Sequence, residues 1–523
     1  MKSNIVYKLY INENLYVEIM YDGKSVRIVS NGNTPKNVVS VSMTRKKAII
    51  KVGLIPKCTI DLESGIVHTE LRVFPTSTVR NFSECINTKA EDEDFIRNQL
   101  EYQKKLKGNP IKNGTELHTH FMEILTGEEF LILILKHIDR IGLDYEDNLC
   151  RAYPLDRIDS KMLDYSEVAS WVDKSEILSN RNLYNKLVSQ LSLPVDRQVS
   201  FSKINEILNR RTALLDLVGY RKSEKTISNL DSYGNSLENT VRKLISDEKA
   251  EIYAEILIKS LETLKKQGIK YVELSFSNPN TIKKIYKKMR ETTVEGIEFR
   301  FLLSENRMLE GNKFKECAKS LKKMINKGYV VGFDLMGMEQ QITPFDYIKN
   351  SPDGNSLYDK LSQVVLTLNS FNNNNLICRL HAGEMSYGIP DIDGKSNPER
   401  TLEILDKIVN DNNIIVPPPT IRLGHALHIS ENDNYLSLLK KYKVIIEINA
   451  SSNFALGNIK NLKNIPYRWY YENGIPMVIG TDGGGFYLTT PIDESKNAEI
   501  FGGRDVAEKI HETDESELGK RGL

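Results

Sequence analysis

The sequence predicts a (β/α)8 barrel, preceded by a small β-rich domain and interrupted by a helical insertion after the first barrel strand. Three observations favour this fold. From Gly114 onward short apolar runs alternate with longer helical patterns, eight such runs can be counted, and polar residues gather directly after several of them. The chain of 523 residues is long enough for a large core and an accessory domain.

Residues 1–90 have the pattern of a separate β-rich accessory domain. Runs such as "LYVEIMYD", "SVRIVS" and "KAIIKV" are rich in β-branched and aromatic residues, and turn residues separate them. The stretch holds no cluster of catalytic type, which favours a role in packing or interaction. Residues 91–113 are polar and helix-like, and we expect them to connect this domain to a barrel over residues 114–523.

Eight apolar runs are candidates for barrel strands, and most segments between them have helical periodicity. The clearest helix precedes the second strand, where apolar residues recur at steps of three and four from Ala250 to Leu264 before Gly268 ends the helix. The first two strands lie about 150 residues apart, several times a usual crossover, which predicts a helical insertion at about 145–250. The predicted strands lie in "TELHTHF", "YVELSFS", "EFRFLLS", "VVGFDLMG", "LICRLHAGE", "TIRLGHA", "VIIEINASSN" and "PMVIGTDGG".

Several predicted strands end in chemically active side chains. His118 and His120 stand two apart in "ELHTH", so on a strand both imidazoles point to the same face. "LHAGE" adds His381 and "GTDGG" adds Asp482. Active sites of such barrels lie at the C-terminal ends of the strands, so these residues can meet there. Three imidazoles and one carboxylate suit a divalent metal of the zinc type, with a position left for water.

A hydrolytic metal site also needs groups that move protons. A metal of this kind lowers the pKa of its water from ~15.7 toward ~7, and Glu384 in "HAGE" and His425 in "RLGHA" are the candidate proton carriers. Each feature alone has an ordinary explanation: a His-x-His pair arises by chance, Asp482 can cap a helix, and His425 can be a hydrogen-bonded core residue. The placement of these residues favours the interpretation as a metal site, because four of the eight histidines lie in clusters at separate predicted strand ends.

The composition argues against several classes of partner. A net charge of +1 gives no signal for nucleic acid, and the longest dense apolar run, "FLILIL", is too short to span a bilayer. The start of the chain lacks the continuous apolar stretch of a secretion signal, and none of the five cysteines forms a Cys-x-x-Cys pair. We therefore expect a cytoplasmic protein with a small-molecule substrate and no membrane partner.

Taken in order, the motifs from about residue 114 to residue 490 resemble those of the adenosine deaminase family of metal-dependent hydrolases. "TELHTHF" is similar to the first-strand motif of the family, "LHAGE" matches closely, "IRLGHA" resembles RIGHG, and "GIPMVIGTDGGG" resembles the last-strand segment. The family has a (β/α)8 barrel and hydrolytically removes the amino group of adenine nucleosides or nucleotides. The resemblance implies one Zn²⁺ per chain, held by His118, His120, His381 and Asp482.

The same resemblance assigns roles around the metal. It implies that Glu384 protonates the ring N1, while His425 orients or deprotonates the water that attacks C6. It also implies that Gly337 in "VVGFDLMGME" contacts the purine. The implied products are ammonia and the inosine or hypoxanthine form of the substrate.

Two positions depart from the family, and both concern the substrate. Gly483 stands where the family usually has a second Asp, which bonds purine N7, and Met122 stands where adenosine enzymes have an Asp that meets the ribose 5′-hydroxyl. A thioether is a poor acceptor, and without a carboxylate a phosphate is not repelled there. We therefore hypothesise a preference for 5′-phosphorylated or deoxy substrates. The candidate phosphate partners in the insertion are Arg210, Arg211, Arg221 and Lys222.

Other interpretations stay open. A related barrel amidohydrolase could act on another purine-type amine, because Gly483 leaves room for one. A degenerate barrel could serve as a binding or assembly module, although the presence of every implied metal ligand argues against it. The N-terminal domain suggests a homo-oligomer or a regulated enzyme. By analogy with deaminases of bacterial antiphage systems, it also raises the hypothesis of a defence role.

Overall fold

The chain divides into two compact units in the computed structural model, one of Met1–Asn109 with Pro194–Gln198 and one of Pro110–Leu193 with Val199–Leu523. Within the ranges 5–69 and 224–242, the description covers only the backbone of the residues named next. The described residues are 5–12, 15–21, 26–30, 39–43, 47–52, 55–61, 67–69, 113–149, 169–194, 198–228, 236–289, 294–339, 342–384, 395–414, 420–428, 433–459 and 461–523.

The described residues of the first unit form two antiparallel sheets. One has the strand order β1-β2-β3 and the other β4-β5-β6-β7. The β-rich character predicted for the start of the chain is therefore confirmed, whereas the predicted connector at 91–113 lies outside the described residues except for residue 113. The strands are β1 (Ile5–Asn12), β2 (Leu15–Tyr21), β3 (Val26–Ser30), β4 (Val39–Met43), β5 (Lys47–Val52), β6 (Ile55–Asp61) and β7 (Val67–Thr69).

The second unit is built on eight parallel strands, as predicted. They follow one another in chain order around the sheet, from β8 to β17. An isolated parallel bridge between Thr119 and Asp482 joins the two outer strands, so the sheet closes into a barrel. The strands are β8 (Thr115–His120), β11 (Tyr271–Phe276), β12 (Glu298–Asn306), β13 (Val330–Met336), β14 (Ile377–Ala382), β15 (Thr420–His425), β16 (Ile445–Ile448) and β17 (Met477–Ile479).

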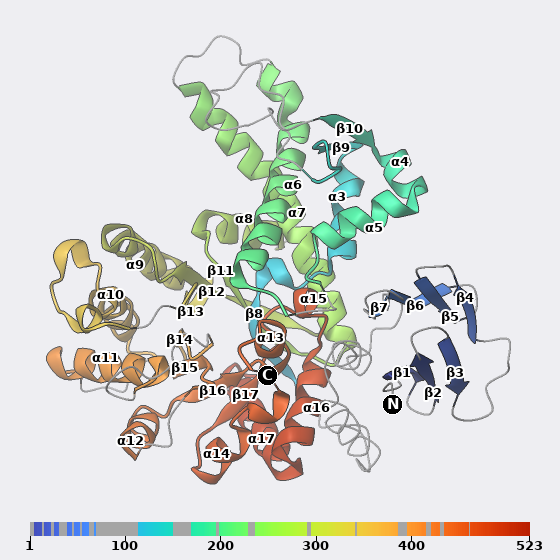
Figure 1. Cartoon of the computed structure of the whole chain (residues 1–523). Helices are drawn as coiled ribbons and strands as arrows, with labels where there is room; N and C mark the ends of the chain where they lie inside the picture. The colour runs from blue at the N-terminus through green and yellow to red at the C-terminus, as the bar shows by residue number, and fades with distance from the viewer. Residues whose placement is uncertain are drawn as a thin grey trace. The chain divides into compact units, whose positions relative to one another are not determined.

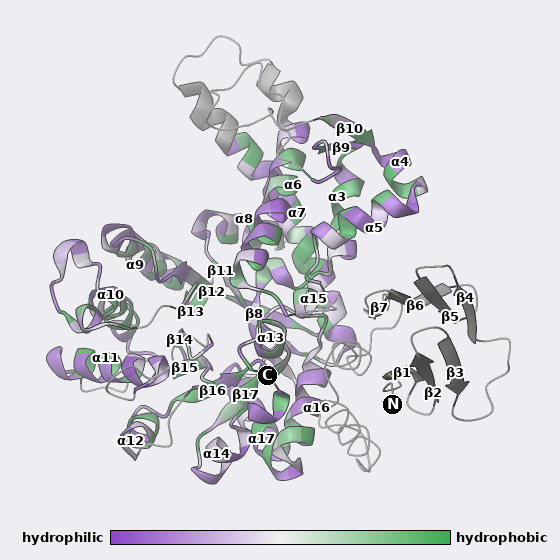
Figure 2. Cartoon of the chain, viewed as in Figure 1, coloured by the Kyte–Doolittle hydropathy of each residue, from purple (hydrophilic) through white to green (hydrophobic). Residues whose placement is uncertain are grey.

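Helices between the strands cover the outside of the barrel (Figure 1). They are amphipathic, and Figure 2 shows hydrophobic and hydrophilic residues alternating along peripheral helices such as α9 and α11. Among the described residues, none of the helices is both long and apolar enough to cross a bilayer. The helices are α8 (Pro279–Met289), α9 (Gly311–Asn326), α10 (Leu357–Asn369), α11 (Asn397–Asp411), α12 (Asp433–Lys441), α13 (Ala450–Ala455), α14 (Tyr467–Glu472), α15 (Gly484–Tyr487), α16 (Pro491–Gly502) and α17 (Arg504–Lys520).

The insertion after the first barrel strand is mainly helical, as predicted. Its long helices α6 and α7 pack side by side and extend away from the strands (Figure 1). Helix α7 runs directly into the turn before β11, and the insertion also holds the antiparallel pair β9–β10, which the sequence pattern did not predict. Its elements are α3 (Gly127–His137), β9 (Arg140–Leu143), β10 (Ser170–Asp173), α4 (Lys174–Ser179), α5 (Arg181–Gln190), α6 (Phe201–Ser228) and α7 (Ser236–Lys266).

Candidate active site

Four histidine rings converge at the C-terminal ends of three barrel strands. The ring centroid of His118 lies 4.8 Å from that of His381, 5.2 Å from that of His425 and 5.8 Å from that of His120. His118 and His120 end β8, His381 lies on β14, and His425 ends β15. Parallel strands place their carboxyl ends at one rim of the barrel, which is why residues far apart in the chain meet there.

Asp482 joins this cluster from the segment after β17. Its Oδ1 lies 3.2 Å from Nε2 of His120 and 3.4 Å from Nε2 of His118. Two backbone hydrogen bonds join Asp482 to β8. Asp482 N donates to His118 O at 2.8 Å, and His120 N donates to Asp482 O at 2.8 Å. The hydrogen bonds that close the barrel therefore also place Asp482 beside the two histidines of β8.

The donor atoms fit a divalent metal ion. Nitrogen and oxygen atoms of His118, His120 and Asp482 lie within 4.8 Å of one another, as do those of His118, His381 and His425. In the described part of the chain Nε2 of His381 and Nε2 of His425 are buried without a hydrogen bond of good geometry. Buried imidazole nitrogens left in this state are costly unless something binds them, and a divalent ion with N and O ligands would do so.

Two residues of the cluster hold an uncommon backbone conformation. His425 has φ 66° and Asp482 has φ 64°. Both values lie in the left-handed region of backbone conformation, which residues other than glycine rarely adopt. Such conformations cost of order 1–3 kcal/mol each and gather at active sites. His425 is the last residue of β15, and Asp482 lies three residues after the end of β17.

A carboxylate below the cluster fixes the orientation of His118. Nδ1 of His118 lies 2.6 Å from Oε2 of Glu447 on β16, and both side chains are fully buried. Burial raises the pKa of Glu447, but Arg379 and His118 outweigh that effect and bring the pKa to about 2. Nδ1 therefore donates to a permanent carboxylate, which leaves Nε2 to face the other donors. A Cβ on Gly424 would lie 2.9 Å from Cε1 of His118, so this glycine makes room for the ring.

Buried charges from several strands form a layer under the site. Arg379 on β14 lies 2.8 Å from Glu447 and 3.4 Å from Asp334. Arg422 on β15 lies 2.6 Å from both Glu273 and Glu517. Each acid faces an arginine, and every member is at most 2% exposed. Because removal of one partner would leave an uncompensated buried charge, this layer holds the strand ends rigidly in place.

Asp334 on β13 links this layer to the cluster. Its Oδ1 lies 3.2 Å from Nε2 of His381. Burial lowers the pKa of His381, but the negative charge of Asp334 outweighs burial and raises the pKa to about 10. His381 therefore carries a proton when no metal ion occupies the site.

Glu384 follows β14 and is held at the rim by its backbone. Both its own N–H and that of Gly383 donate to the carboxylate of Glu339, at distances of 2.7–2.9 Å. Gly383 has φ 84°, which favours glycine in this turn. The Glu384 carboxyl lies 3.8 Å from His381 Nδ1 and 3.7 Å from His425 Nε2. Burial raises its pKa, but His425 and His381 lower it below the ordinary value.

His425 is arranged to accept a proton. Its Nδ1 lies 3.0 Å from Oδ1 of Asn453, an acceptor, so Nδ1 carries the hydrogen and Nε2 is left with a lone pair. Burial lowers the pKa of His425 to about 4, so the ring is neutral near pH 7. A neutral imidazole whose free nitrogen faces a carboxyl group can take a proton from water and pass it on.

The predicted substrate-contacting residues lie at the same rim. Gly337, with φ 97°, follows β13, and a Cβ there would lie 2.5 Å from Oδ1 of Asn306. Met122 lies in the 3-10 turn η1 (Phe121–Glu123) after β8, where its side chain packs on the hydrophobic core. Gly483 follows Asp482 directly and is the N-cap residue of α15.

The basic residues of the insertion do not form the expected phosphate site. Arg211 is fully buried, and its guanidinium donates to the backbone carbonyls of Met122, Leu125 and Leu191. Arg210 pairs with Glu206 at 2.8 Å on the same helix. Lys222 lies 3.2 Å from Glu251, and the Arg221 guanidinium lies over the Trp171 ring. Arg211 thus braces the turn that carries Met122, and its expected role toward a phosphate is wrong.

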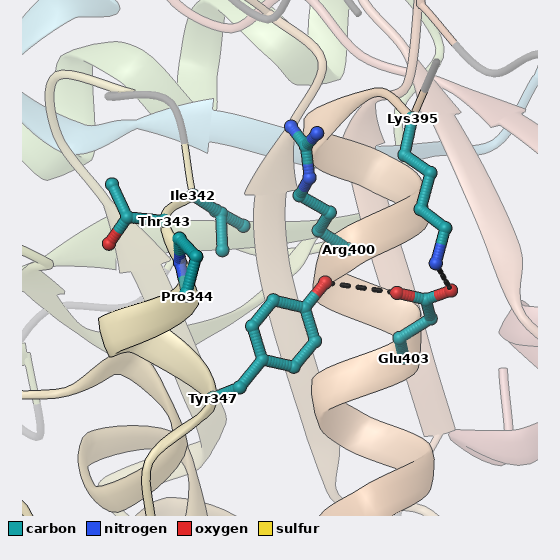
Figure 3. Close-up of a pocket in the computed structure, with 7 residues that line it drawn as sticks. All are labelled: Ile342, Thr343, Pro344, Tyr347, Lys395, Arg400 and Glu403. Carbon is teal, nitrogen blue, oxygen red and sulfur yellow. Dashed lines mark hydrogen bonds and ion pairs between the residues drawn. The ribbon is translucent and has the colours of Figure 1, made fainter. Parts of the chain in front are cut away.

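A separate open pocket lies beside η2 (Pro344–Tyr347) and the start of α11 (Figure 3). It contains none of the predicted site residues. Its polar groups bind one another, because the Tyr347 hydroxyl donates to Glu403 at 3.0 Å and Lys395 lies 2.5 Å from the same carboxylate. The pocket is lined by Ile342, Thr343, Pro344, Tyr347, Lys395, Arg400 and Glu403.

Several known proteins resemble the chain in sequence. It is 27% identical over 169 residues to an adenosine deaminase of Plasmodium gallinaceum, covering 32% of this chain and 37% of that protein. It is 31% identical over 153 residues to an adenosine deaminase of Enterococcus faecalis, covering 29% of this chain and 34% of that protein. A longer match, 23% identical over 321 residues, is to an adenosine deaminase of Clostridium perfringens, covering 58% and 83%.

The chain is therefore similar in sequence, over part of its length, to known adenosine deaminases. No family model matches it. The chain spans about a third of the length of the first curated relatives it matches. Among solved structures, the N6-methyl-AMP deaminase from Arabidopsis thaliana is similar, with a TM-score of 0.44 and 16% identity over 79% of this chain and 95% of that one.

Several residues of this site were not found from the sequence. They are Asp334, Glu339, Glu447 and Asn453, all of which are buried. The sequence did indicate Glu123, an acid adjacent to Met122, and this residue is 7% exposed. A usable signal was present for two of the four missed residues, because "GFDLM" and "VIIEI" each contain one charge inside an apolar strand. A charged side chain on a buried strand needs a partner of opposite charge or a hydrogen-bond donor, and here the partners are histidines and arginines of the site.

Proposed function

We propose that this chain hydrolytically removes the amino group of an adenine nucleoside or nucleotide with the help of one zinc ion. The observation that carries the proposal is the convergence of three histidines and Asp482 with two further groups, Glu384 and His425, that are suited to carry protons. His118, His120, His381 and Asp482 would hold the ion, and they offer the nitrogen and oxygen donors that zinc accepts. A bound ion of this kind supplies a nucleophile at neutral pH, since it lowers the pKa of water.

The residues of the chain then account for the proton transfers. Neutral His425 accepts a proton from the attacking water at its free Nε2, which Asn453 leaves available by holding Nδ1. Glu384 lies 3.7 Å from that nitrogen, so a proton can pass between them. Glu384 delivers a proton to the ring nitrogen beside the reacting carbon, which lets the ring accept electrons before ammonia leaves.

The choice among adenine compounds rests on one residue. Met122 provides no carboxylate for a free 5′-hydroxyl and no charge that repels a phosphate, which supports a 5′-phosphorylated or deoxy substrate. Arg211 no longer supports this choice, because its donors are bound to backbone carbonyls. The alternative substrate class, another purine-type amine, is supported by Gly483, because this position has no side chain and leaves room for such a compound.

A panel of substrates, assayed on one preparation, tests both the proposed deamination and the proposed preference for a phosphorylated or deoxy substrate. Ammonia release should be measured for adenosine, deoxyadenosine, AMP, dAMP and ATP, with guanine and a pterin amine as the alternative class. The proposal predicts the largest kcat/KM for an adenine compound, and for a phosphorylated or deoxy one. If adenosine exceeds all the others by about tenfold, the inference from Met122 fails while deamination stands. Release only from guanine or the pterin would favour the alternative class.

A further inference from the structure

Two buried side chains of opposite charge bind the backbone of the segment that carries His381 and Glu384. The Arg307 guanidinium donates to the carbonyl oxygen of His381, with 2.5 Å between Nη2 and O. The Glu339 carboxylate accepts the N–H groups of Gly383 and Glu384 at 2.7–2.9 Å. Arg307 is 9% exposed and Glu339 is 1% exposed. One cation and one anion therefore bind successive peptide groups of this segment.

Both charged residues are themselves fixed to the barrel. Arg307 directly follows β12 and Glu339 lies three residues after β13, and these two strands precede β14 in the sheet. The N–H of Arg307 donates to Met336 O at 2.9 Å, and its carbonyl oxygen accepts from Nζ of Lys360 on α10 at 2.9 Å. Burial raises the pKa of Glu339 and the positive charge of Arg307 opposes that rise, so the two groups lie close enough to interact.

The turn after β14 depends on these contacts for its hydrogen bonds. Strand β14 ends at Ala382, and Gly383 has φ 84°, so the chain leaves the strand direction there. The two residues after β15 donate to the carbonyl oxygens of Ala382 and Gly383, at 2.9 and 3.2 Å. Glu339 supplies the acceptor for the N–H groups of Gly383 and Glu384. Buried peptide groups need such partners, and loss of the acceptor would favour a displaced segment.

We propose that Arg307 and Glu339 are positioning residues, which hold the Glu384 carboxyl group where it can deliver a proton. This inference rests on the proposed function. Neither residue is a proposed metal ligand or proton carrier, so both act through the segment that they bind. Displacement of a reacting group by about 1 Å can cost ~10²-fold in rate, so small movements of this segment matter.

The first test is the kinetics of Glu339→Gln, loaded with zinc, on the best adenine substrate. The amide replaces one carboxylate oxygen with an NH2 group, which cannot accept from Gly383 or Glu384. We expect kcat to fall ~10–100-fold and KM to change less than about threefold, because Glu339 contacts the segment and not the substrate. Glu310→Gln is the matched control, since Glu310 is 70% exposed and pairs with Lys313. An unchanged kcat in Glu339→Gln would overturn the role of Glu339.

Two substitutions of Arg307 test the other contact. Arg307→Lys keeps a donor for the carbonyl oxygen of His381, whereas Arg307→Met keeps none. The lysine variant should therefore retain most of the kcat that the methionine variant loses. Arg300→Met on the same strand is the control, because Arg300 pairs with Glu298 at 3.1 Å and is 39% exposed. Equal kcat in Arg307→Met and the unaltered chain would overturn the role of Arg307.

A double-mutant cycle distinguishes positioning of Glu384 from a general structural effect. If Glu339 acts through Glu384, then Glu339→Gln should lower kcat less than about threefold further when Glu384→Gln is already present. A general structural effect would instead lower kcat by the same factor in both backgrounds, and that result would overturn the proposal. Thermal denaturation shows which variants fold. If Arg307→Met does not fold, Arg307→Lys and Glu339→Gln carry the test.

Hydrogen exchange provides a readout that does not need activity. In Glu339→Gln the amide hydrogens of Gly383 and Glu384 should exchange faster than in the unaltered chain, while those of α9 should not change. Unchanged exchange in this segment would overturn the role of Glu339 while deamination stands. No ammonia from any amine with the unaltered chain would instead overturn the proposed function, and proton delivery with it.

Discussion

Glu447 holds His118 through a hydrogen bond of 2.6 Å between Oε2 and Nδ1, at a point where neither side chain is exposed to solvent. The same carboxylate lies 2.8 Å from Nε of Arg379. Because the arginine fixes the carboxylate and the carboxylate fixes the ring, the direction of His118 Nε2 is set before any ligand arrives.

Replacement of Glu447 with Gln should weaken metal binding although it removes no proposed ligand. The amide keeps the size of the side chain but loses its charge, and loss of such a partner typically costs ~10–100-fold in metal affinity. Competition with a chelator of known affinity measures this. Glu517→Gln is the control, because Glu517 pairs with Arg422 and no described histidine. Equal metal affinity in Glu447→Gln and the unaltered chain would contradict the role of Glu447.

Replacement of Glu384 with Gln should reduce the rate and leave metal content and folding unchanged. The variant loses the group that delivers a proton, and removal of a general acid typically lowers the rate ~10²–10⁴-fold. Steady-state kinetics and elemental analysis on one preparation provide both readouts. Glu512→Gln on the exposed side of α17 serves as control. Activity within a few-fold of the unaltered chain would show that Glu384 acts only in the structure.

Replacement of Arg211 with Met should destabilise the fold rather than change the choice of substrate. The variant loses hydrogen bonds to three backbone carbonyls and the stacking on Phe130 and Phe486, for a loss of about 2–4 kcal/mol in the free energy of unfolding. Urea denaturation measures it. Arg210→Ala should cost ~0.5 kcal/mol or less, because its ion pair lies near the surface. A stable Arg211→Met with a raised KM for nucleotides alone would restore the phosphate role.

Glu494 on α16 should make stability depend on pH. Burial raises its pKa to about 7 from the ordinary 4.5, so the folded state binds this proton more tightly than the unfolded state does. The resulting stability is complete below pH 4.5 and is lost as the pH rises through 7, up to roughly 3 kcal/mol. Glu494→Gln imitates the protonated form. Its thermal midpoint should therefore fall less than that of the unaltered chain between pH 5 and pH 8.5, and parallel curves would contradict the shift.

The barrel and the convergence of the cluster were predictable because they depend on order along the chain. When strands and helices alternate, the C-terminal ends of all the parallel strands lie at one rim of the barrel. The positions of four residues after apolar runs therefore predicted that they lie together, namely His118, His381, His425 and Asp482. The tie between Asp482 and β8 then follows from closure of the barrel.

The features of the site that could not be predicted from the sequence depend on contacts between particular side chains. Nothing in "NRRTALL" distinguishes a solvated arginine from one buried under another turn, so Arg211 is one of four candidate phosphate partners in the sequence, whereas in the structure it binds backbone carbonyls. A Cβ on Gly483 would lie 2.5 Å from Cβ of Glu123, and this closeness depends on the distance between β8 and the segment after β17. Local patterns carry no information on such contacts.

Ammonia release in water enriched in heavy oxygen tests the central claim most directly. The unaltered chain, loaded with zinc, should release ammonia from an adenine nucleoside or nucleotide and place one heavy oxygen in the product for each ammonia. His118→Ala/His120→Ala should lose most of its metal by elemental analysis and release none. Full activity in that double variant, or no ammonia from any adenine compound with the metal-loaded chain, would contradict the claim.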